Sequence, residues 1–381
     1  MTKKFEYTTF ANRFAARFPL FSYVGIQINF WIIANCLLIT IMYLHAEIIS
    51  QIYKVKIAIS FIAFIKMAII AGVLYGFILG YTNYYFDKNL FKKLPIGKII
   101  LFKTLTSLLL LISLLWLIRF ELFDFFVPVT FYESGFKISD ATWDSLFYLL
   151  MIYYFFMTLI ISFINQVNKK YGPGVVVPLL FGKYRHPKEE VRIFMFMDLK
   201  SSTATAEKLG HLKYSAFIRD CFDDINEVIL PYLAQVYQYV GDEIVLMWPE
   251  EEGLKDQNCI QFFFACKKQF HKRADFYTKS YGTIPEFKAG LHLGKVTAVE
   301  IGEIKKDIAY HGDTLNTAAR IQSVCNEYNK DFLVSEYLLE RIGASQNVLT
   351  ESMGMILLRG KTNKVGIASI NGIETGQEKL V

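Results

Sequence analysis

Two aspartates, Asp198 and Asp242, stand where short apolar runs end in the second half of the chain. The run Arg192–Met197 (RIFMFM) ends directly at Asp198, and Asp242 lies between the two apolar runs of Ala234–Pro249 (AQVYQYVGDEIVLMWP). A Gly-Asp pair between alternating apolar runs is typical of a tight hairpin, so we expect Asp242 at its tip. Carboxylates gathered at the rim of a sheet suit Mg²⁺ or Mn²⁺, which bind a few carboxylates together with substrate phosphates.

A second set of candidate residues lies in His311–Gln322 (HGDTLNTAARIQ). A Gly-Asp turn leads there into a predicted helix, on which Asn316 and Arg320 are four residues apart and therefore share one face. An amide beside a guanidinium can hold a sugar oxygen and stabilise a charged phosphoryl transition state. Each of these residues also has a plainer interpretation on its own, as a helix cap, a turn residue or a polar side chain on a helix surface.

The elements predicted around the aspartates explain how residues far apart in sequence can meet. They form the order strand, helix, hairpin, helix, strand, which is that of a ferredoxin-like α+β domain. In such a sheet the end of the first strand and the tip of the hairpin lie side by side, which would bring Asp198 and Asp242 into one site. In chain order the predicted elements are Arg192–Met197, Leu212–Leu230, Ala234–Pro249, Cys259–Tyr281 and Glu286–Gly294.

The first part of the chain has the composition of a membrane protein. Of the 381 residues 53% are hydrophobic and only 20% are charged, and the apolar residues are concentrated before about Val167. Four runs reach the roughly 20 apolar residues that a helix needs to cross a bilayer, near residues 21–44, 60–84, 99–120 and 146–167. We therefore expect a membrane domain with four transmembrane helices at residues 1–167, a linker containing glycine and proline at 168–189, and a soluble domain at 190–381.

Charged residues are distributed unevenly between these runs. Basic residues precede the first run, fill the second connection and follow the fourth run, whereas the third connection is mainly acidic. Because positive residues stay on the cytoplasmic side, both termini are predicted to be cytoplasmic; Lys54 and Lys56 in the first connection are the discordant signal. The basic residues are Lys3, Lys4, Arg13, Arg17, Lys88, Lys92, Lys93, Lys98, Lys169, Lys170, Lys183 and Arg185, and the acidic ones are Glu121, Asp124, Glu133, Asp140 and Asp144.

Several classes of function receive little support from the sequence. The net charge of +6 comes with lysines beside the apolar runs, so it gives no reason to expect a nucleic-acid partner. The five cysteines have no paired or metal-ligand spacing, which suits a reducing compartment. A transporter or channel would need more polar residues than Asn29, Asn35 and Lys66, the last of which either extends to the membrane edge or has a function inside it.

Four motifs, in their order and spacing, resemble the catalytic domain of class III adenylate and guanylate cyclases over roughly Glu190 to Ile370. The resemblance implies a palm-type, ferredoxin-like α+β domain behind an all-α transmembrane bundle. It also implies an enzyme that cyclises a nucleoside triphosphate and releases pyrophosphate. The motifs are FMDLKSST (Phe196–Thr203), YVGDEIVLMW (Tyr239–Trp248), GLHLGKV (Gly290–Val296) and HGDTLNTAARIQ (His311–Gln322).

The resemblance implies roles for individual residues. Asp198, Asp242 and the backbone carbonyl of Leu199 would bind two Mg²⁺ or Mn²⁺ ions, which activate the ribose 3′-hydroxyl and hold the phosphates. Asn316 would orient the ribose, and Arg320 would stabilise the α-phosphate as its charge develops. In this family the aspartates of one chain face the Asn/Arg pair of another, so the resemblance implies a homodimer with two interfacial sites.

Three further positions concern the substrate. Lys361 takes the place of the family's triphosphate-binding lysine, while Gln238 and Ala309 stand where many members have the residues that select the base. These two positions therefore specify neither adenine nor guanine. ATP is favoured by analogy, because bacterial members mostly make cyclic AMP, and a guanylate cyclase or a catalytically silent nucleotide-binding receptor stays an alternative. The expected place is the bacterial inner membrane, in contact with lipid, with the catalytic domain in the cytoplasm.

Overall fold

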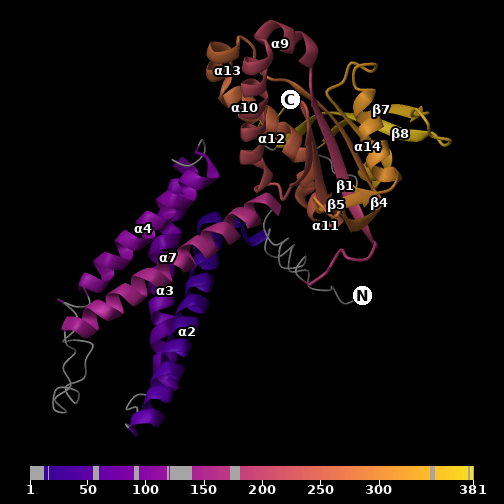
Figure 1. Ribbon diagram of the computed structural model, residues 1–381. Helices are drawn as coiled ribbons and strands as arrows, with labels where there is room; N and C mark the ends of the chain where they lie inside the picture. Colours follow the sequence, from indigo (N-terminus) through magenta and orange to yellow (C-terminus); the bar gives the residue numbers. More distant parts are fainter. Residues whose placement is uncertain are drawn as a thin grey trace. The chain divides into compact units, whose positions relative to one another are not determined.

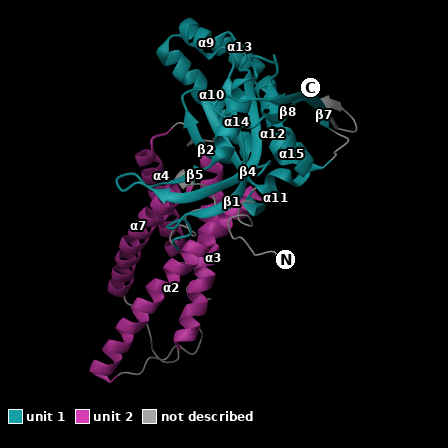
Figure 2. Cartoon of the chain, turned by 90° about the vertical axis from the view of Figure 1, so that its right-hand side faces the viewer, with its two compact units in different colours: residues 1–17, 177–381 teal, residues 18–176 magenta. Residues whose placement is uncertain are grey.

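The computed structural model describes residues 13–15, 17–54, 60–89, 94–117, 120, 140–171, 181–343, 348–375 and 378–380. The chain divides into two compact units, which are coloured separately in Figure 2. One, here called the membrane unit, is Phe18–Val176; the other, here called the sheet unit, combines Met1–Arg17 with Val177–Val381.

The membrane unit contains the four predicted membrane-type helices. All four are long and apolar enough to cross a membrane, with bounds that differ by one to nine residues from the expected runs. The acidic residues Glu121, Asp124 and Glu133, and the Gly-Pro-Gly segment 172–174, lie outside the described residues. The helices are α2 (Pro19–Tyr53), α3 (Phe61–Asn89), α4 (Ile96–Leu117) and α7 (Asp140–Tyr171).

Helix α3 packs against α2 through three glycines spaced four residues apart, Gly72, Gly76 and Gly80. A Cβ at Gly76 would lie 2.6 Å from the Cα of Ile28, and a Cβ at Gly72 would lie 2.7 Å from the Cα of Ile32. Real Cβ atoms do not come so close to backbone, so only glycine permits this approach. Small residues at this spacing let membrane helices pack backbone to backbone, and here they join two helices of the same chain.

Buried polar side chains connect the four helices further. Tyr75 on α3 donates to the carbonyl oxygen of Ser107 on α4 at 2.6 Å, and the Ser107 hydroxyl lies 2.8 Å from that of Thr158 on α7. Tyr154 on α7 donates to the side-chain oxygen of Asn35 on α2 at 2.7 Å. Asn35, one of the candidate pore residues, is therefore used inside the bundle; such hydrogen bonds hold membrane helices together where lipid offers no partner.

A charged pair lies within the same bundle. The Lys103 ammonium on α4 is 2.9 Å from Asp87 at the end of α3, and their side chains are only 4% and 11% exposed. Tyr23 on α2 donates to the same carboxylate at 2.8 Å. Ionisable residues inside membrane bundles are usually paired in this way. Lys66, by contrast, is exposed on α3.

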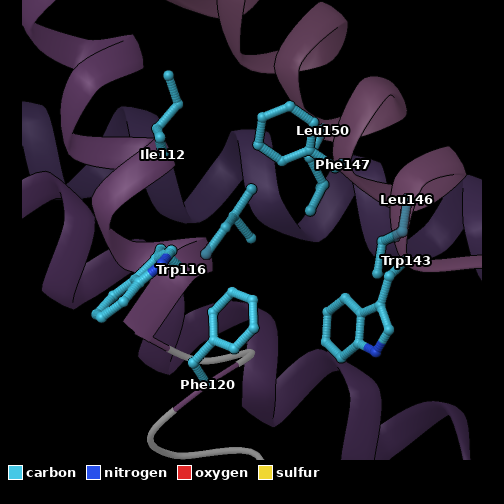
Figure 3. Close-up of a pocket in the computed structure, with 8 residues that line it drawn as sticks. Ile112, Trp116, Phe120, Trp143, Leu146, Phe147 and Leu150 are labelled. Atoms are coloured by element: carbon cyan, nitrogen blue, oxygen red, sulfur yellow. The ribbon is translucent and has the colours of Figure 1, made fainter. Parts of the chain in front are cut away.

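An apolar pocket of about 150 Å³ opens between α4 and α7 (Figure 3). Aromatic side chains supply half of its lining, and no charged residue contributes among the described ones. Such a lining suits hydrocarbon, the environment that a membrane provides. The lining residues are Ile112, Leu115, Trp116, Phe120, Trp143, Leu146, Phe147 and Leu150.

The sheet unit is built on one mixed sheet of order β2-β3-β1-β4-β6-β8-β7, with β5 added to β4 and β9 to β8. The strands are β1 (Lys188–Leu199), β2 (Gln235–Val240), β3 (Glu243–Pro249), β4 (Phe287–Ile301), β5 (Asp307–His311), β6 (Phe332–Ser335), β7 (Val348–Ile356), β8 (Val365–Thr375) and β9 (Glu378–Leu380). The helices are α9 (Ser202–Leu209), α10 (His211–Ile229), α11 (Glu250–Leu254), α12 (Asn258–Lys272), α13 (Ala274–Tyr281), α14 (Asp313–Ser323) and α15 (Glu336–Ile342).

The expected α+β fold is therefore confirmed, with two corrections to single elements. The predicted helix Cys259–Tyr281 is divided into α12 and α13, because Arg273 between them leaves the helical conformation (φ −106°, ψ 18°). The predicted strand Glu286–Gly294 continues as β4 to Ile301, where it pairs with β5. No glycine or proline marks the helix break, so no local pattern predicts it.

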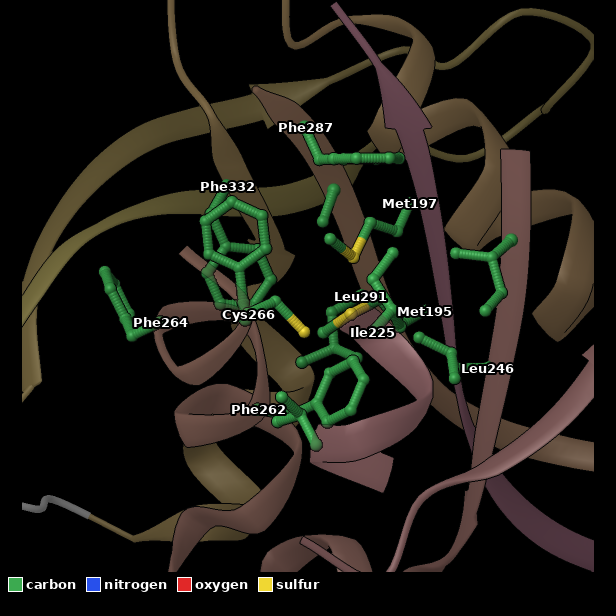
Figure 4. Packing of buried hydrophobic residues seen from close by; sticks show 14 of the residues in the cluster. Met195, Met197, Ile225, Leu246, Phe262, Phe264, Cys266, Phe287, Leu291 and Phe332 are labelled. Atoms are coloured by element: carbon green, nitrogen blue, oxygen red, sulfur yellow. The ribbon is translucent and has the colours of Figure 1, made fainter. Parts of the chain in front are cut away.

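Strand β1 runs through the middle of the sheet, and its side chains contribute to an apolar cluster on each face of the sheet. Met195 and Met197 point into the main core, which they share with residues of α10 and α12 such as Ile225 and Phe262 (Figure 4). Phe194 belongs to a second cluster on the other face, where α14 packs (Figure 1). Side chains alternate along a strand, so Asp198, an even-numbered residue like Phe194, points towards the α14 face.

Helix α14 approaches the sheet closely at a glycine of β4. A Cβ at Gly290 would lie 2.2 Å from the backbone nitrogen of Gln322 and 2.6 Å from the carbonyl oxygen of Ala318. Gly290 therefore lets the helix rest on the backbone of the strand. This contact fixes the height of α14 above the end of β1.

Candidate active site

Asp198 and Asp242 meet at the edge where β1 and the β2–β3 hairpin end. Asp198 pairs with Glu243, the first residue of β3, so Asp242 lies in the turn directly beside it. Burial and the neighbouring charge of Asp242 both raise the pKa of Asp198. A carboxylate whose ionisation is disfavoured by a neighbouring carboxylate is stabilised by positive charge close to it.

Glu243 adds a third carboxylate that the sequence analysis did not select. It stands directly opposite Asp198, and residues directly opposite in an antiparallel pair project from the same face. Burial, together with the charges of Asp198 and Asp242, raises the pKa of Glu243 to about 7. The Gly-Asp-Glu sequence at a hairpin tip was the available signal.

The donors of this edge fit a divalent cation that brings further ligands with it. Carboxylate oxygens are the ligands that Mg²⁺ and Mn²⁺ prefer, and Mg²⁺ keeps several waters or substrate oxygens in its shell. Among the described residues no group of three or more His, Cys, Asp or Glu side chains could hold a metal ion by itself. An open site that protein carboxylates share with phosphate oxygens is consistent with both observations.

Two further side chains contact Asp198. The Lys288 ammonium on β4 lies 3.4 Å from Asp198 Oδ2, and Gln322 on α14 donates to the same oxygen at 3.1 Å. Lys288 pairs with Asp198 in the β1–β4 register. Neither contact follows from sequence spacing, because each depends on which strand and which helix lie next to β1.

A second cluster lies on α14 and the turn before β8. Asn316 is exposed and Arg320 is half-buried. Within the described residues, Nη1 of Arg320 is buried and has no hydrogen-bond partner. A Cβ at Gly360 would lie 3.1 Å from this nitrogen, so the turn before Lys361 lies against the guanidinium. A buried donor without an acceptor is costly, and an anionic ligand would satisfy it.

Lys361 shares this region. Its ammonium pairs with the exposed carboxylate of Asp313, at the start of α14, while the lysine side chain itself is only 14% exposed. Burial, and then the charge of Lys361, lowers the pKa of His292 to about 4. His292 is thus neutral near pH 7, and Lys361 and Arg320 supply the positive charge here.

Residues 183–369 match the family model described as the adenylate and guanylate cyclase catalytic domain. Residues 183–369 of this chain form a class III cyclase domain. The chain is 35% identical over 210 residues to adenylate cyclase 2 of Rhizobium meliloti (strain 1021), a match that covers 55% of this chain and 58% of that one. It is 22% identical over 185 residues to adenylate cyclase 1 of the same organism, covering 47% and 27%. The chain thus spans less than two thirds of the length of these relatives.

Solved structures of cyclases are also similar. The adenylyl cyclase CyaB from P. aeruginosa is 16% identical, covers 50% of this chain and 97% of its own, and has a TM-score of 0.43. The guanylate cyclase domain of RhGC from Catenaria anguillulae, in complex with GTP, is 17% identical, covers 49% and 100%, and has a TM-score of 0.42.

The remaining predicted site residues lie on the cyclase domain as follows. Gln238 is exposed on β2, directly after a bulge at Tyr237. Ala309 is 7% exposed on β5, where its methyl group provides no hydrogen bond. Leu199 ends β1, with its side chain buried in the core.

The geometry of α14 separates the two clusters of the cyclase domain. Successive residues of a helix are about 100° apart around its axis, so Gln322 projects about 200° away from Arg320. Because Gln322 contacts Asp198, Arg320 points away from the Asp198 carboxylate of its own chain. The structure therefore brings Asp198 and Asp242 together, and Arg320 near Lys361, but does not join the two clusters.

Proposed function

We propose that the chain is a membrane-bound adenylate cyclase, which converts ATP to 3′,5′-cyclic AMP and pyrophosphate. The convergence of Asp198 and Asp242 at the open edge of the sheet is the observation that carries this proposal. It agrees with the cyclase family of the domain and with the 35% identity to a protein named adenylate cyclase 2. The four membrane-type helices support attachment to a membrane, for which we propose the bacterial inner membrane with the cyclase domain in the cytoplasm.

The reaction is in-line attack of the ribose 3′-oxygen on the α-phosphorus, with pyrophosphate as the leaving group. Asp198, Asp242 and the carbonyl of Leu199 would hold two Mg²⁺ or Mn²⁺ ions, which supply charge neutralisation and a more acidic 3′-hydroxyl. Arg320 would donate its free Nη1 to the α-phosphate as negative charge develops there. Asn316, one turn earlier, would hold a ribose oxygen and so fix the attack angle.

Lys361 would bind the β- and γ-phosphates. In the resting chain its ammonium is paired with Asp313, whose side chain is 73% exposed. An exposed carboxylate contributes little as a partner, so a triphosphate with several negative charges would replace it. Asp313 then keeps the lysine in place until substrate arrives.

The active enzyme would be a homodimer. Asn316 is exposed, and Arg320 faces away from the aspartates of its own chain, so each cluster needs its complement from elsewhere. A second copy of the chain supplies that complement twice, because a two-fold interface repeats every contact. Two active sites per dimer follow.

GTP is the second candidate substrate. The Gln238 amide can donate to or accept from either purine, and Ala309 adds no polar group. Neither position holds a charge that would reject guanine. The preference for ATP depends on the curated relatives, which are named adenylate cyclases.

One experiment tests the chemistry and the interface together. The full chain, purified in detergent, is given Mn²⁺ with ATP or with GTP, and cyclic products are measured by mass spectrometry. We expect cyclic AMP from wild type and none from Asp198→Ala or from Arg320→Ala alone. Mixing the two variants should restore activity, since one site of each heterodimer is intact. No product from either nucleotide would overturn the proposal, and no recovery on mixing would overturn the shared site.

A further inference from the structure

We propose that Lys288 is a built-in counter-cation of the metal site, which holds the Asp198 carboxylate until divalent cations bind and competes with them for it. This inference rests on the proposed metal-binding role of Asp198. It assigns to a residue of β4 a function in setting the metal affinity of the site, in addition to the ligands themselves.

The pairing of three neighbouring strands places charged side chains in one row across the sheet. Glu243, Asp198 and Lys288 stand directly opposite one another on β3, β1 and β4. Residues paired in this way project from the same face of the sheet. A single row across the sheet therefore contains two carboxylates and one ammonium, with Asp198 in the middle and Asp242 beside it.

The Lys288 side chain is largely buried. The Lys288 side chain is 13% exposed, and that of Asp198 is 24% exposed. The ammonium lies 3.4 Å from Asp198 Oδ2, and its second contact is the side-chain oxygen of Asn326 at 3.5 Å. An ammonium this far out of water needs an anionic partner. Without Lys288, the side chains of Asp198, Asp242 and Glu243 would lie together with no ammonium among these paired positions.

One oxygen of the Asp198 carboxylate receives two contacts. Lys288 and Gln322 both contact Oδ2 of Asp198. Gln322 is 6% exposed and is held by the close packing of α14 on Gly290. The two contacts, one from β4 and one from α14, thus hold Oδ2 of the carboxylate in position. Lys288 supplies charge in this arrangement, whereas Gln322 supplies only position.

The consequence is an exchange of charges. When no cation is bound, Lys288 reduces the repulsion among Asp198, Asp242 and Glu243. When cations bind, its ammonium lies within a few ångströms of further positive charge, and the repulsion weakens binding. Removing the lysine should therefore destabilise the metal-free protein and tighten metal binding.

Lys288→Met tests this directly, because methionine retains much of the apolar stem and removes the charge. In the full chain, Mn²⁺ binding is measured by electron paramagnetic resonance, and the thermal midpoint Tm is measured in EDTA and in excess Mn²⁺. We expect a lower Tm than wild type in EDTA, a larger rise of Tm on adding Mn²⁺, and a Kd for Mn²⁺ about tenfold lower. Lys288→Arg, which keeps the charge, should stay close to wild type in both measurements.

Lys200→Met is the matched control. Lys200 follows β1 and pairs with Asp331 and Glu286, so its loss removes a partly buried ion pair near the same edge without touching Asp198. It should leave the Kd for Mn²⁺ unchanged. If Lys288→Met binds Mn²⁺ no more tightly than wild type does, the inference is wrong. Should Lys288→Met not fold, Lys288→Gln is measured in the same way.

The test separates this inference from the proposed function. Wild type that binds Mn²⁺ and makes cyclic nucleotide, with Lys288→Met unchanged in affinity, would reject the role of Lys288 alone. Wild type that binds no Mn²⁺, or binds it equally after Asp198→Ala, would reject the metal site and with it the proposed function.

Discussion

Arg13, which precedes the first membrane helix, donates from Nε to Oε1 of Glu252 at 2.7 Å. Both residues belong to the sheet unit. Glu252 lies on α11, directly after β3, and is only 2% exposed. Its second oxygen is buried without a hydrogen-bond partner among the described residues. The carboxylate therefore depends on an arginine that is 239 positions away in sequence. Arg13 therefore belongs to the same compact unit as the cyclase domain.

Arg13→Ala should destabilise the sheet unit, since it leaves the buried Glu252 carboxylate without its positively charged partner. Arg13 is itself 43% exposed, so we expect about 1–2 kcal/mol rather than the 3–5 kcal/mol of a fully buried pair. Thermal unfolding of the full chain in detergent, compared with wild type, measures the loss. In a Glu252→Gln background the same substitution should cost much less; an equal cost in both backgrounds would show that the ion pair is not responsible.

The residues that the sequence predicted and those that it missed differ in a physical way. Asp198 and Asp242 could be placed together because each follows a strand and a hairpin fixes its own tip. Lys288 could not, because its position opposite Asp198 depends on which strand pairs with β1 and in which register. The Arg13–Glu252 pair was hidden for the same reason, since local periodicity contains no information about contacts between distant segments.

Some missed features did have a sequence signal. Gly72, Gly76 and Gly80 are spaced four apart in an apolar run, which is a helix-packing pattern, but the sequence does not tell which partner helix they contact. Glu243 follows Asp242 directly, yet only the register shows that it faces Asp198 rather than the opposite layer. Gly294, the end of the predicted strand, interrupts the apolar pattern because Thr314 packs against it; a Cβ there would lie 2.4 Å from the Thr314 hydroxyl.

Gly76→Ala should disrupt the packing of α2 on α3, because the added Cβ would lie 2.6 Å from the Cα of Ile28. Overpacking of this kind costs about 1–3 kcal/mol. Cys36 on α2 is the one cysteine of the five that is not buried, and its maleimide labelling rate, followed by mass spectrometry, should rise. Gly25→Ala on α2 is the control, since its Cβ would meet nothing within 4 Å. Equal labelling in the two variants would contradict the glycine contact.

Glu243 should make the metal-free protein less stable as the pH rises towards 7. Its pKa is raised to about 7 in the folded chain, above its ordinary value of 4.5. Between these values the folded state binds more protons than the unfolded state, so stability falls as pH increases through this window and levels off above it. In EDTA, Glu243→Gln should therefore raise Tm at pH 8 and lose this advantage near pH 4.5. A difference in Tm that does not change with pH would show that the carboxyl charge is not the cause.

Arg320→Met should separate catalysis from stability. Nη1 of Arg320 is buried without a partner among the described residues, so the resting protein gains nothing from that donor. Its removal should change the free energy of unfolding by no more than about 0.5 kcal/mol, and Tm correspondingly little. Turnover, by contrast, should fall by about 10²–10³, the usual effect of removing one donor to a developing negative charge. Steady-state assays with Mn²⁺ and ATP measure kcat, and Mn²⁺ binding confirms that the aspartates are intact. A large loss of Tm with unchanged kcat would instead make Arg320 a structural residue of α14.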